Sequence, residues 1–389
     1  MIENYNFFAN RLADKEIQLA EVYESIGKLQ IVNITLDRAV DDAQAIFESL
    51  NSTGKELSES DLIRNYVLMG LEPSEQTYVY EHLWRPMEQL FIYETQGTVM
   101  DAFFRHYLTM KLSRIPKQGR VYEEFKLYHL NCEFGTIREL CQDLLDYAKY
   151  YTNIVFKRNS DTDLKKLYKD IIDLRMEVSY PFLLKIHRDC TEELITLDEL
   201  KEILKLCISY VLRRAICEIP TNSMNKTFAT LKNYIRLDDY LNSVKAFFVM
   251  QDTYKEFPDD DKFEDAFVSR DIYNMRARNY ILSRLENSEN KAPIIIENYT
   301  IEHIMPQNKN LSSEWQEELG ADWREIQKKY LHTIGNLTLT AYNSEMSDRP
   351  FLEKMDMSGG FKEAHLGLIN MWFCKMSGMK NISKREQMN

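Results

Sequence analysis

The chain has 389 residues, of which 44% are hydrophobic and 12% aromatic, so it is long enough for two or three domains and too apolar to be disordered. Glycine occurs 12 times and proline 9 times, together about 5% of the residues against about 12% in an average protein, which disfavours turn-rich sandwiches, barrels and propellers. The formal net charge of -12 argues against nucleic-acid binding through overall charge. The segment 291–389 is nearly neutral, however, with 12 basic and 13 acidic residues, and leaves room for a phosphate-binding site.

The sequence predicts a cytoplasmic protein. Its six cysteines are far apart and form no C-x-x-C pair, which is typical of buried free thiols in a reducing compartment. The N-terminus has no basic segment followed by an apolar core, so no signal peptide is predicted. No apolar run approaches the ~18 residues of a membrane span, so we expect no membrane partner.

The N-terminal part is predicted to be mostly helical with one short strand. Apolar periodicity predicts helix within residues 1–30, alternation predicts a strand at 29–36, and helix returns at 41–50. Asn51 to Gly54 is typical of a turn in which glycine supplies a positive φ. Ser58 with Asp61 resembles a capping box that starts a helix through Leu71.

Residues 75–285 predict roughly eight further helices. No glycine occurs between Gly135 and Gly320, and Leu, Ile, Lys and Glu are dense there. Segment 256–261 is the best candidate for a linker. Arg213 and Arg214 are expected either to bond to nearby acids within a helix or to bind phosphate. The fold class predicted for this region is therefore mainly α, a multi-helix scaffold.

The pattern changes to a compact mixed unit after about residue 287. Strands are predicted at 292–296, 300–304 and 333–340, because these segments are rich in β-branched residues. A polar insert with helices at 313–319 and 322–330 separates the last two strands, and a helix follows around 349–355. The order is strand, insert, strand, helix.

Two segments of this unit hold side chains suited to phosphodiester hydrolysis. Histidine can deprotonate a water at neutral pH, and a hard divalent cation bound by oxygen ligands can neutralise the phosphate. Glu302 and Asn343 are therefore predicted to hold a metal and His303 to activate the water, while Asn336 hydrogen-bonds the backbone that aims His303. Neighbours on a regular strand point to opposite faces, so Glu302 and His303 share one site only if the strand ends or bulges there.

These segments resemble the HNH nuclease domain. They are similar to the C-terminal nuclease of GmrSD-like modification-dependent restriction endonucleases. The similarity lies in the pattern Glu302-His-Ile-x-Pro306, followed by His332-x-Ile-Gly-Asn336-Leu-Thr-Leu and a later asparagine. The Phe-x-x-Lys element that ends at Lys354 is similar as well. The resemblance covers about residues 290–389 and implies a small C-terminal ββα-metal unit.

The resemblance also implies roles for single residues. His303 corresponds to the general base, Glu302 and Asn343 to metal ligands, and Asn336 to the central asparagine, which the resemblance places among the catalytic residues. His332 either contacts phosphate or metal or packs at a strand end, and Lys354 either contacts phosphate or is a solvated helix residue.

Two further segments resemble the same proteins. Residues 45–63 are similar to the end of their ParB/sulfiredoxin-like N-terminal domain, and 210–220 to a stretch between the two domains. The D-G-Q-Q-R loop that this N-terminal domain uses for nucleotide binding does not occur here, so the chain is expected to be a fragment. Asn51 and Gly54 are either the remains of a nucleotide site or a structural turn, and an NTP is expected only in an intact, longer protein.

Together these observations predict three domains: a remnant of the N-terminal domain at 1–80, a helical scaffold at 81–286 and an HNH nuclease at 287–389. The predicted function is metal-dependent DNA cleavage in a restriction system that attacks phage or modified DNA, with Mg²⁺ or Mn²⁺ as the metal. A homo-oligomer or a partner N-terminal domain is a further expectation. The alternative is a regulatory or scaffold fragment whose nuclease unit is inactive without the missing nucleotide-binding domain.

Overall fold

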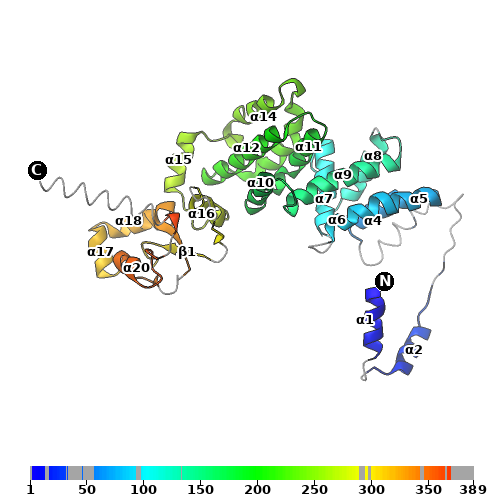
Figure 1. Cartoon of the computed structure of the whole chain (residues 1–389), viewed down its shortest axis with the longest axis horizontal. Coiled ribbons are helices and arrows are strands. Elements are labelled where there is room, and N and C mark those ends of the chain that lie inside the picture. The colour runs from blue at the N-terminus through cyan, green and yellow to red at the C-terminus, as the bar shows by residue number, and fades with distance from the viewer. Residues whose placement is uncertain are drawn as a thin grey trace, which may run out of the picture. The chain divides into compact units, whose positions relative to one another are not determined.

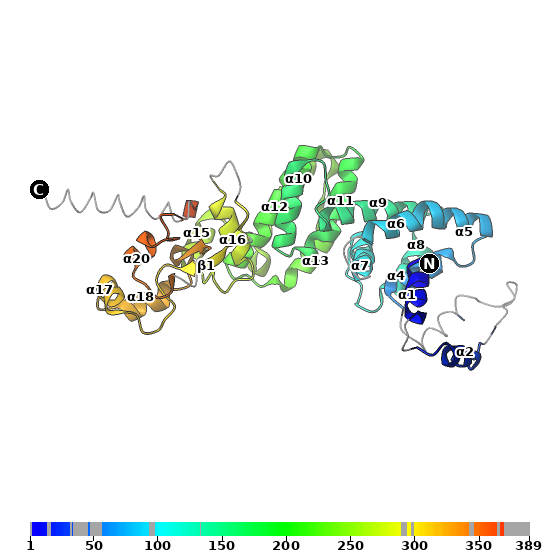
Figure 2. The ribbon, with the colours of Figure 1, turned by 60° about the horizontal axis from the view of Figure 1, so that its bottom comes forward.

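A computed structural model of the chain describes residues 2–13, 17–31, 33, 46, 57–92, 98–132, 134–288, 294–296, 299–341, 346–363 and 366–368. The described part is mainly helical, with one sheet of two strands, which confirms the predicted mainly α class (Figures 1 and 2). The chain divides into two compact units, Met1–Leu57 and Ser58–Asn389. None of the described helices is both long and apolar enough to cross a membrane.

The first unit contains two helices in its described part, α1 (Ile2–Leu12) and α2 (Leu19–Gly27). The helix predicted within residues 1–30 is therefore interrupted. Of the strand predicted at 29–36, the described residues 29–31 and 33 are not in a strand. The helix predicted at 41–50 lies outside the described residues except for Ile46, and the turn from Asn51 to Gly54 lies entirely outside them.

The second unit begins with a helix, α4, whose first turn is capped by a local side chain. Ser58 Oγ accepts a hydrogen bond from Asp61 N at 3.1 Å and donates one to Asp61 Oδ2 at 2.8 Å. The helices of this region are α4 (Glu59–Leu68), α5 (Pro73–Val79), a π-helical turn (Tyr80–Trp84), α6 (Arg85–Phe91), α7 (Thr98–Leu112) and α8 (Val121–Asn131).

Longer helices follow, and two of them start with a complete capping box. Thr136 and Glu139 cap one, and Thr196 and Glu199 cap the other. These helices are α9 (Ile137–Val155), α10 (Thr162–Asp173), α11 (Tyr180–Thr191), α12 (Leu197–Ile216), α13 (Met224–Leu231), α14 (Tyr240–Val249), α15 (Asp260–Ser269) and α16 (Arg278–Glu286).

The prediction of roughly eight helices between residues 75 and 285 was too low, because the described structure has the twelve α-helices α5 to α16. Helices α13 and α14, for example, are separated by 3-10 turns without glycine or proline, so the sequence showed no break. Of the predicted linker at 256–261, residues 256–259 form a short connection and 260–261 belong to α15. Pro258 is buried and Phe257 packs against the helical core.

Most helices of the second unit surround an aromatic core. Phe103, Phe104 and Tyr107 on α7 are completely buried, and Phe103 contacts Phe91 and Tyr151 from two other helices. Burying rings of this size contributes a large part of the hydrophobic free energy of folding. We call this cluster the helical core.

A second hydrophobic cluster, the C-terminal core, surrounds the sheet. Strand β1 (Thr300–His303) pairs antiparallel with β2 (Leu337–Thr340), and His303 lies opposite Leu337. Helices α17 (Ser313–Leu319) and α18 (Trp323–Tyr330) form the insert, and α20 (Phe351–Asp356) follows the sheet; Figure 1 shows them gathered around β1. Leu337, Leu339, Trp315 and Phe351 are among the buried residues of this core.

The strand predictions for this part hold only in part. The strand at 300–304 is confirmed as β1, but that at 333–340 begins at Leu337 because Ile334–Asn336 form a 3-10 turn. Of the strand at 292–296, the described residues 294–296 are not in a strand. Helix α12 belongs to both cores, since Leu204 and Tyr210 are buried in the helical core and Ile216 in the C-terminal core.

Candidate functional site

The end of strand β1 places His303 at the edge of the sheet, next to a tight turn. Ile304 N donates a hydrogen bond to Asn336 O at 2.9 Å, one step beyond the last paired residue. Asn336 Oδ1 accepts a hydrogen bond from Met305 N at 2.7 Å, and its Nδ2 donates to Met305 O at 3.1 Å and to Leu331 O at 2.8 Å. The buried amide of Asn336 therefore ties the chain after His303 to the turn before β2.

The imidazole of His303 is packed against two other rings. A hydrogen bond of 3.1 Å joins His303 Nε2 to His332 Nδ1. The ring of Tyr273 stacks on His332, with centroids 5.2 Å apart and planes at 12°, and meets His303 edge to face at 4.5 Å. His303 is 3% exposed, whereas His332 is only partly buried. Of the two imidazoles, His332 is therefore the one in contact with solvent.

The surroundings of His303 keep it neutral. Burial lowers its pKa to about 4, the charges of His332 and Lys354 act in the same direction, and Asp271 opposes them. A neutral imidazole can accept a proton at neutral pH, as a general base must. Nδ1 of His303 is buried and has no hydrogen-bond partner among the described residues, so this nitrogen is not engaged by another side chain there.

The carboxylate of Glu302 lies in a different environment. Lys354 Nζ on α20 donates hydrogen bonds to Glu302 Oε1 at 2.6 Å, to His303 O at 3.0 Å and to Ile304 O at 3.4 Å. Both side chains are buried, and Lys354 is 0% exposed. Burial raises the pKa of the Glu302 carboxyl, and the Lys354 ammonium opposes this rise.

This arrangement corrects the expectation for Lys354. The residue is not a solvated helix lysine, because its ammonium is fully buried and bonds to three oxygen acceptors. Its contact with phosphate stays a prediction. No described contact joins the side chains of Glu302 and His303, which bond to Lys354 and His332 respectively. Adjacent strand positions point to opposite faces, which accounts for the separation.

The predicted metal site is described only in part. Glu302 supplies a buried carboxylate, and Thr338, its neighbour across the sheet, has a buried hydroxyl oxygen without a hydrogen-bond partner among the described residues. The described residues contain no group of three or more His, Cys, Asp or Glu side chains that would hold a metal. The predicted ligand Asn343 and the predicted nucleotide-site residues Asn51 and Gly54 lie outside the described residues.

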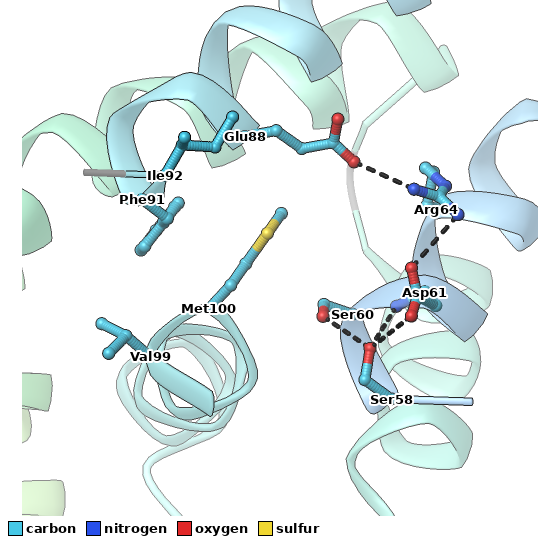
Figure 3. A pocket seen from close by; sticks show the side chains of 9 residues that line it. All are labelled: Ser58, Ser60, Asp61, Arg64, Glu88, Phe91, Ile92, Val99 and Met100. Atoms are coloured by element: carbon cyan, nitrogen blue, oxygen red, sulfur yellow. Dashed lines mark hydrogen bonds and ion pairs between the residues drawn. The ribbon is translucent and has the colours of Figure 1, made fainter. Parts of the chain in front are cut away.

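A separate pocket of about 310 Å³ lies in the helical part of the second unit (Figure 3). Its polar side chains bond to one another: Arg64 pairs with Asp61 at 3.1 Å and with Glu88 at 3.2 Å. Figure 3 shows Phe91, Val99 and Met100 on its apolar side. Because its charged groups satisfy each other, the pocket shows no group prepared for a reaction.

Tyr273 was missed by the sequence analysis. It precedes β1 by 27 positions and has no motif around it, so a single sequence offered no signal that it would contact His303 and His332. The only hint was its chemistry, since an aromatic residue in a mixed unit can pack against imidazole rings.

Comparison with protein families accounts for both ends of the chain. Residues 257–374, which include His303, His332 and Asn336, match the model described as GmrSD restriction endonucleases, C-terminal domain. Residues 1–68 match the GmrSD restriction endonuclease, N-terminal domain. The two matches occur in the order in which the domains are named. The chain belongs to the GmrSD restriction endonuclease family.

Membership of the GmrSD family supports a restriction nuclease role with DNA as the substrate. The C-terminal GmrSD match begins at residue 257 and so includes α15, α16 and Tyr273 as well as the sheet. No curated protein matches the chain.

Proposed function

We propose that this chain is a metal-dependent endonuclease of the HNH type, which hydrolyses phosphodiester bonds of phage or modified DNA within a restriction system. The observation that carries the proposal is the state of His303. This imidazole is neutral, hydrogen-bonded through Nε2, and free at Nδ1 among the described residues. The family match at residues 257–374 supports the choice of DNA as substrate.

His303 acts in this proposal as the general base, with Asn336 as the residue that fixes its position. Proton transfer to a positioned imidazole accelerates hydrolysis by about 10²- to 10⁴-fold. The bonds between Asn336 and Met305 fix the backbone that follows His303, so the base does not move relative to the sheet. Asp271 stabilises the imidazolium that forms, since its charge raises the pKa of His303.

Glu302 and Asn343 are the residues that would hold the metal, Mg²⁺ or Mn²⁺. Oxygen donors of this kind suit hard divalent cations. A bound cation would neutralise charge on the scissile phosphate and on the leaving oxygen. Lys354 sets the position of the Glu302 carboxylate through the 2.6 Å contact between its Nζ and Oε1.

The test is plasmid cleavage by the full chain with Mg²⁺ or Mn²⁺, compared with His303→Ala. We expect His303→Ala to reduce the cleavage rate by about 10²-fold or more, because the general base is lost. His82→Ala, which removes an exposed histidine of the helical part, is the matched control and should cleave like the unmodified chain.

Equal cleavage by the unmodified chain and His303→Ala would contradict the assignment of the base. If neither protein cleaves any DNA with either metal, the alternative of an inactive scaffold fragment is favoured. A titration of Mn²⁺ against Asn343→Ala tests the metal site: we expect a higher metal concentration for half-maximal cleavage, and an unchanged titration curve would contradict the ligand assignment.

A further inference from the structure

We propose that Tyr273 is a positioning residue for the histidine pair: its ring holds His332 in the orientation that pairs it with His303. This inference rests on the proposed function of His303 as the base. It adds a residue from outside the sheet, in the connection between α15 and α16, to the parts that prepare His303 for proton transfer.

The backbone holds Tyr273 against His332. Ile272 N and Tyr273 N both donate to His332 O, at 2.9 and 3.2 Å. One residue further on each side, Asp271 and Thr333 form an isolated antiparallel bridge. Arg278 Nη1 donates to Tyr273 O at 3.0 Å. Tyr273 cannot move away from the histidines without breaking these bonds.

The rings add a second restraint. Tyr273 lies nearly parallel to His332, with an angle of 12° between planes, and so covers one face of that imidazole. It also contacts His303 edge to face, at a centroid distance of 4.5 Å and an angle of 65°. An imidazole covered on its face cannot flip about its Cβ–Cγ bond unless the covering ring moves, because the flip passes through the perpendicular orientation.

The orientation of His332 decides which nitrogen of His303 is able to act. With Nδ1 of His332 as the acceptor, Nε2–H of His303 donates the 3.1 Å hydrogen bond and His303 Nδ1 carries no proton. A flipped His332 would present a carbon in place of Nδ1, the hydrogen bond would be lost, and both tautomers of His303 would be populated. Tyr273 therefore preserves the hydrogen bond on which this tautomer of His303 depends.

The experiment compares Tyr273→Leu and Tyr273→Phe with the unmodified chain. Single-turnover cleavage of a DNA duplex gives the rate, fluorescence anisotropy of the same duplex gives its affinity, and ¹⁵N NMR of the imidazoles gives the tautomers. Tyr299→Leu is the matched control, because Tyr299 is a partly buried tyrosine next to β1 whose ring has no contact with either histidine among the described ring pairs.

For Tyr273→Leu we expect a cleavage rate about 10- to 100-fold lower with duplex affinity unchanged, and ¹⁵N signals that show mixed tautomers of His303. Tyr273→Phe should keep the rate and the tautomer, because the ring and not the hydroxyl makes the described contacts. Tyr299→Leu should leave both unchanged.

Unchanged imidazole signals in Tyr273→Leu would overturn the inference, whether or not the chain cleaves DNA. The failure of the proposed function is distinct: it would appear as cleavage that does not depend on His303. Circular dichroism tests whether the variants stay folded. If Tyr273→Leu and Tyr273→Phe both lose cleavage rate and folded structure, this result also counts against a positioning role.

Discussion

The imidazole of His187 is buried between α10 and α11 with both ring nitrogens paired. Tyr168 Oη donates to His187 Nε2 at 2.7 Å, and His187 Nδ1 donates to Leu183 O at 2.7 Å. This pattern requires the neutral ring, and burial lowers the pKa of His187 to about 4. This buried histidine therefore affects how stability depends on pH.

The sign of this effect follows from proton binding. The unfolded chain binds a proton at His187 below about pH 6.5, but the folded chain does so only near pH 4, so stability falls as pH decreases through this window. We expect His187→Phe to lower the free energy of unfolding at pH 7 by about 1–3 kcal/mol, because Tyr168 loses its partner. Between pH 6.5 and 4, the free energy of unfolding of this variant should decrease less than that of the unmodified chain. Urea unfolding at several pH values measures both effects, with His82→Phe as the exposed control. The prediction would be contradicted if the free energy of unfolding changed equally with pH in His187→Phe and in the unmodified chain.

The buried pair of Glu302 and Lys354 gives a second prediction at the residue scale. Removing one partner of such a pair leaves the other charge buried and unpaired. We expect Lys354→Met to lower the free energy of unfolding by about 3–5 kcal/mol, and the double variant with Glu302→Gln to lose less than this. Urea unfolding of both variants checks the pair, with Lys362→Met as the exposed control on the same segment. Equal losses in the single and double variants would exclude a coupled pair.

At the scale of elements, the end of α12 is tied to two later segments by one arginine. Arg214 is 0% exposed and donates to Tyr210 Oη at 2.9 Å, Pro220 O at 2.6 Å and Tyr254 O at 3.0 Å. Arg213 instead pairs with the exposed Asp260 and with Pro258 O. The expectation that both arginines bond to nearby acids therefore holds for Arg213 only, because Arg214 uses neutral oxygens among its described partners.

The difference between the two arginines predicts different costs of removal. Arg214→Leu leaves buried carbonyl groups without donors, and we expect a loss of about 3–5 kcal/mol in the free energy of unfolding. Arg213→Leu removes a pair with an exposed partner, and we expect a loss of about 1 kcal/mol. Urea unfolding of the two variants, measured side by side, would contradict this account if Arg213→Leu were the more destabilising.

In its described part, the second unit has two hydrophobic cores, and helix α12 contributes buried residues to both. The buried residues of α12 between Leu200 and Val211 belong to the helical core, and Ile216 is buried in the C-terminal core. A helix is cooperative along its length, so loss of one core is expected to destabilise the other. The shared helix is also the physical link between the helical part and the sheet that carries His303.

This arrangement predicts that both cores unfold together. Trp84 is buried in the helical core and Trp315 in the C-terminal core, so each reports on one of them in a variant that keeps it as the only tryptophan. We expect the two fluorescence transitions in urea to coincide, and Ile216→Ala, with a cost of about 2–5 kcal/mol, to shift both. Leu352→Ala, at an exposed leucine, is the control. A shift seen by Trp315 alone would show independent cores.

The sequence by itself determined the features that depend on residues a few positions apart. The capping box of Thr196 and Glu199, the mainly helical class and the positions of β1 and α17 follow from local spacing, because caps and periodicity act within one or two turns. The motif around Glu302 and His303 was visible for the same reason, and it led to the family that the comparisons show.

Only the tertiary structure decided which groups meet. Lys354 lies 52 positions after Glu302 and Tyr273 lies 30 before His303, so neither contact follows from spacing along the chain. Burial then lowered the pKa of His303, because a closed core disfavours the charged form of an imidazole that solvent would stabilise. The sequence indicated His303 as a candidate base, but only the fold shows that His332 and Tyr273 are its neighbours and that Glu302 pairs with Lys354.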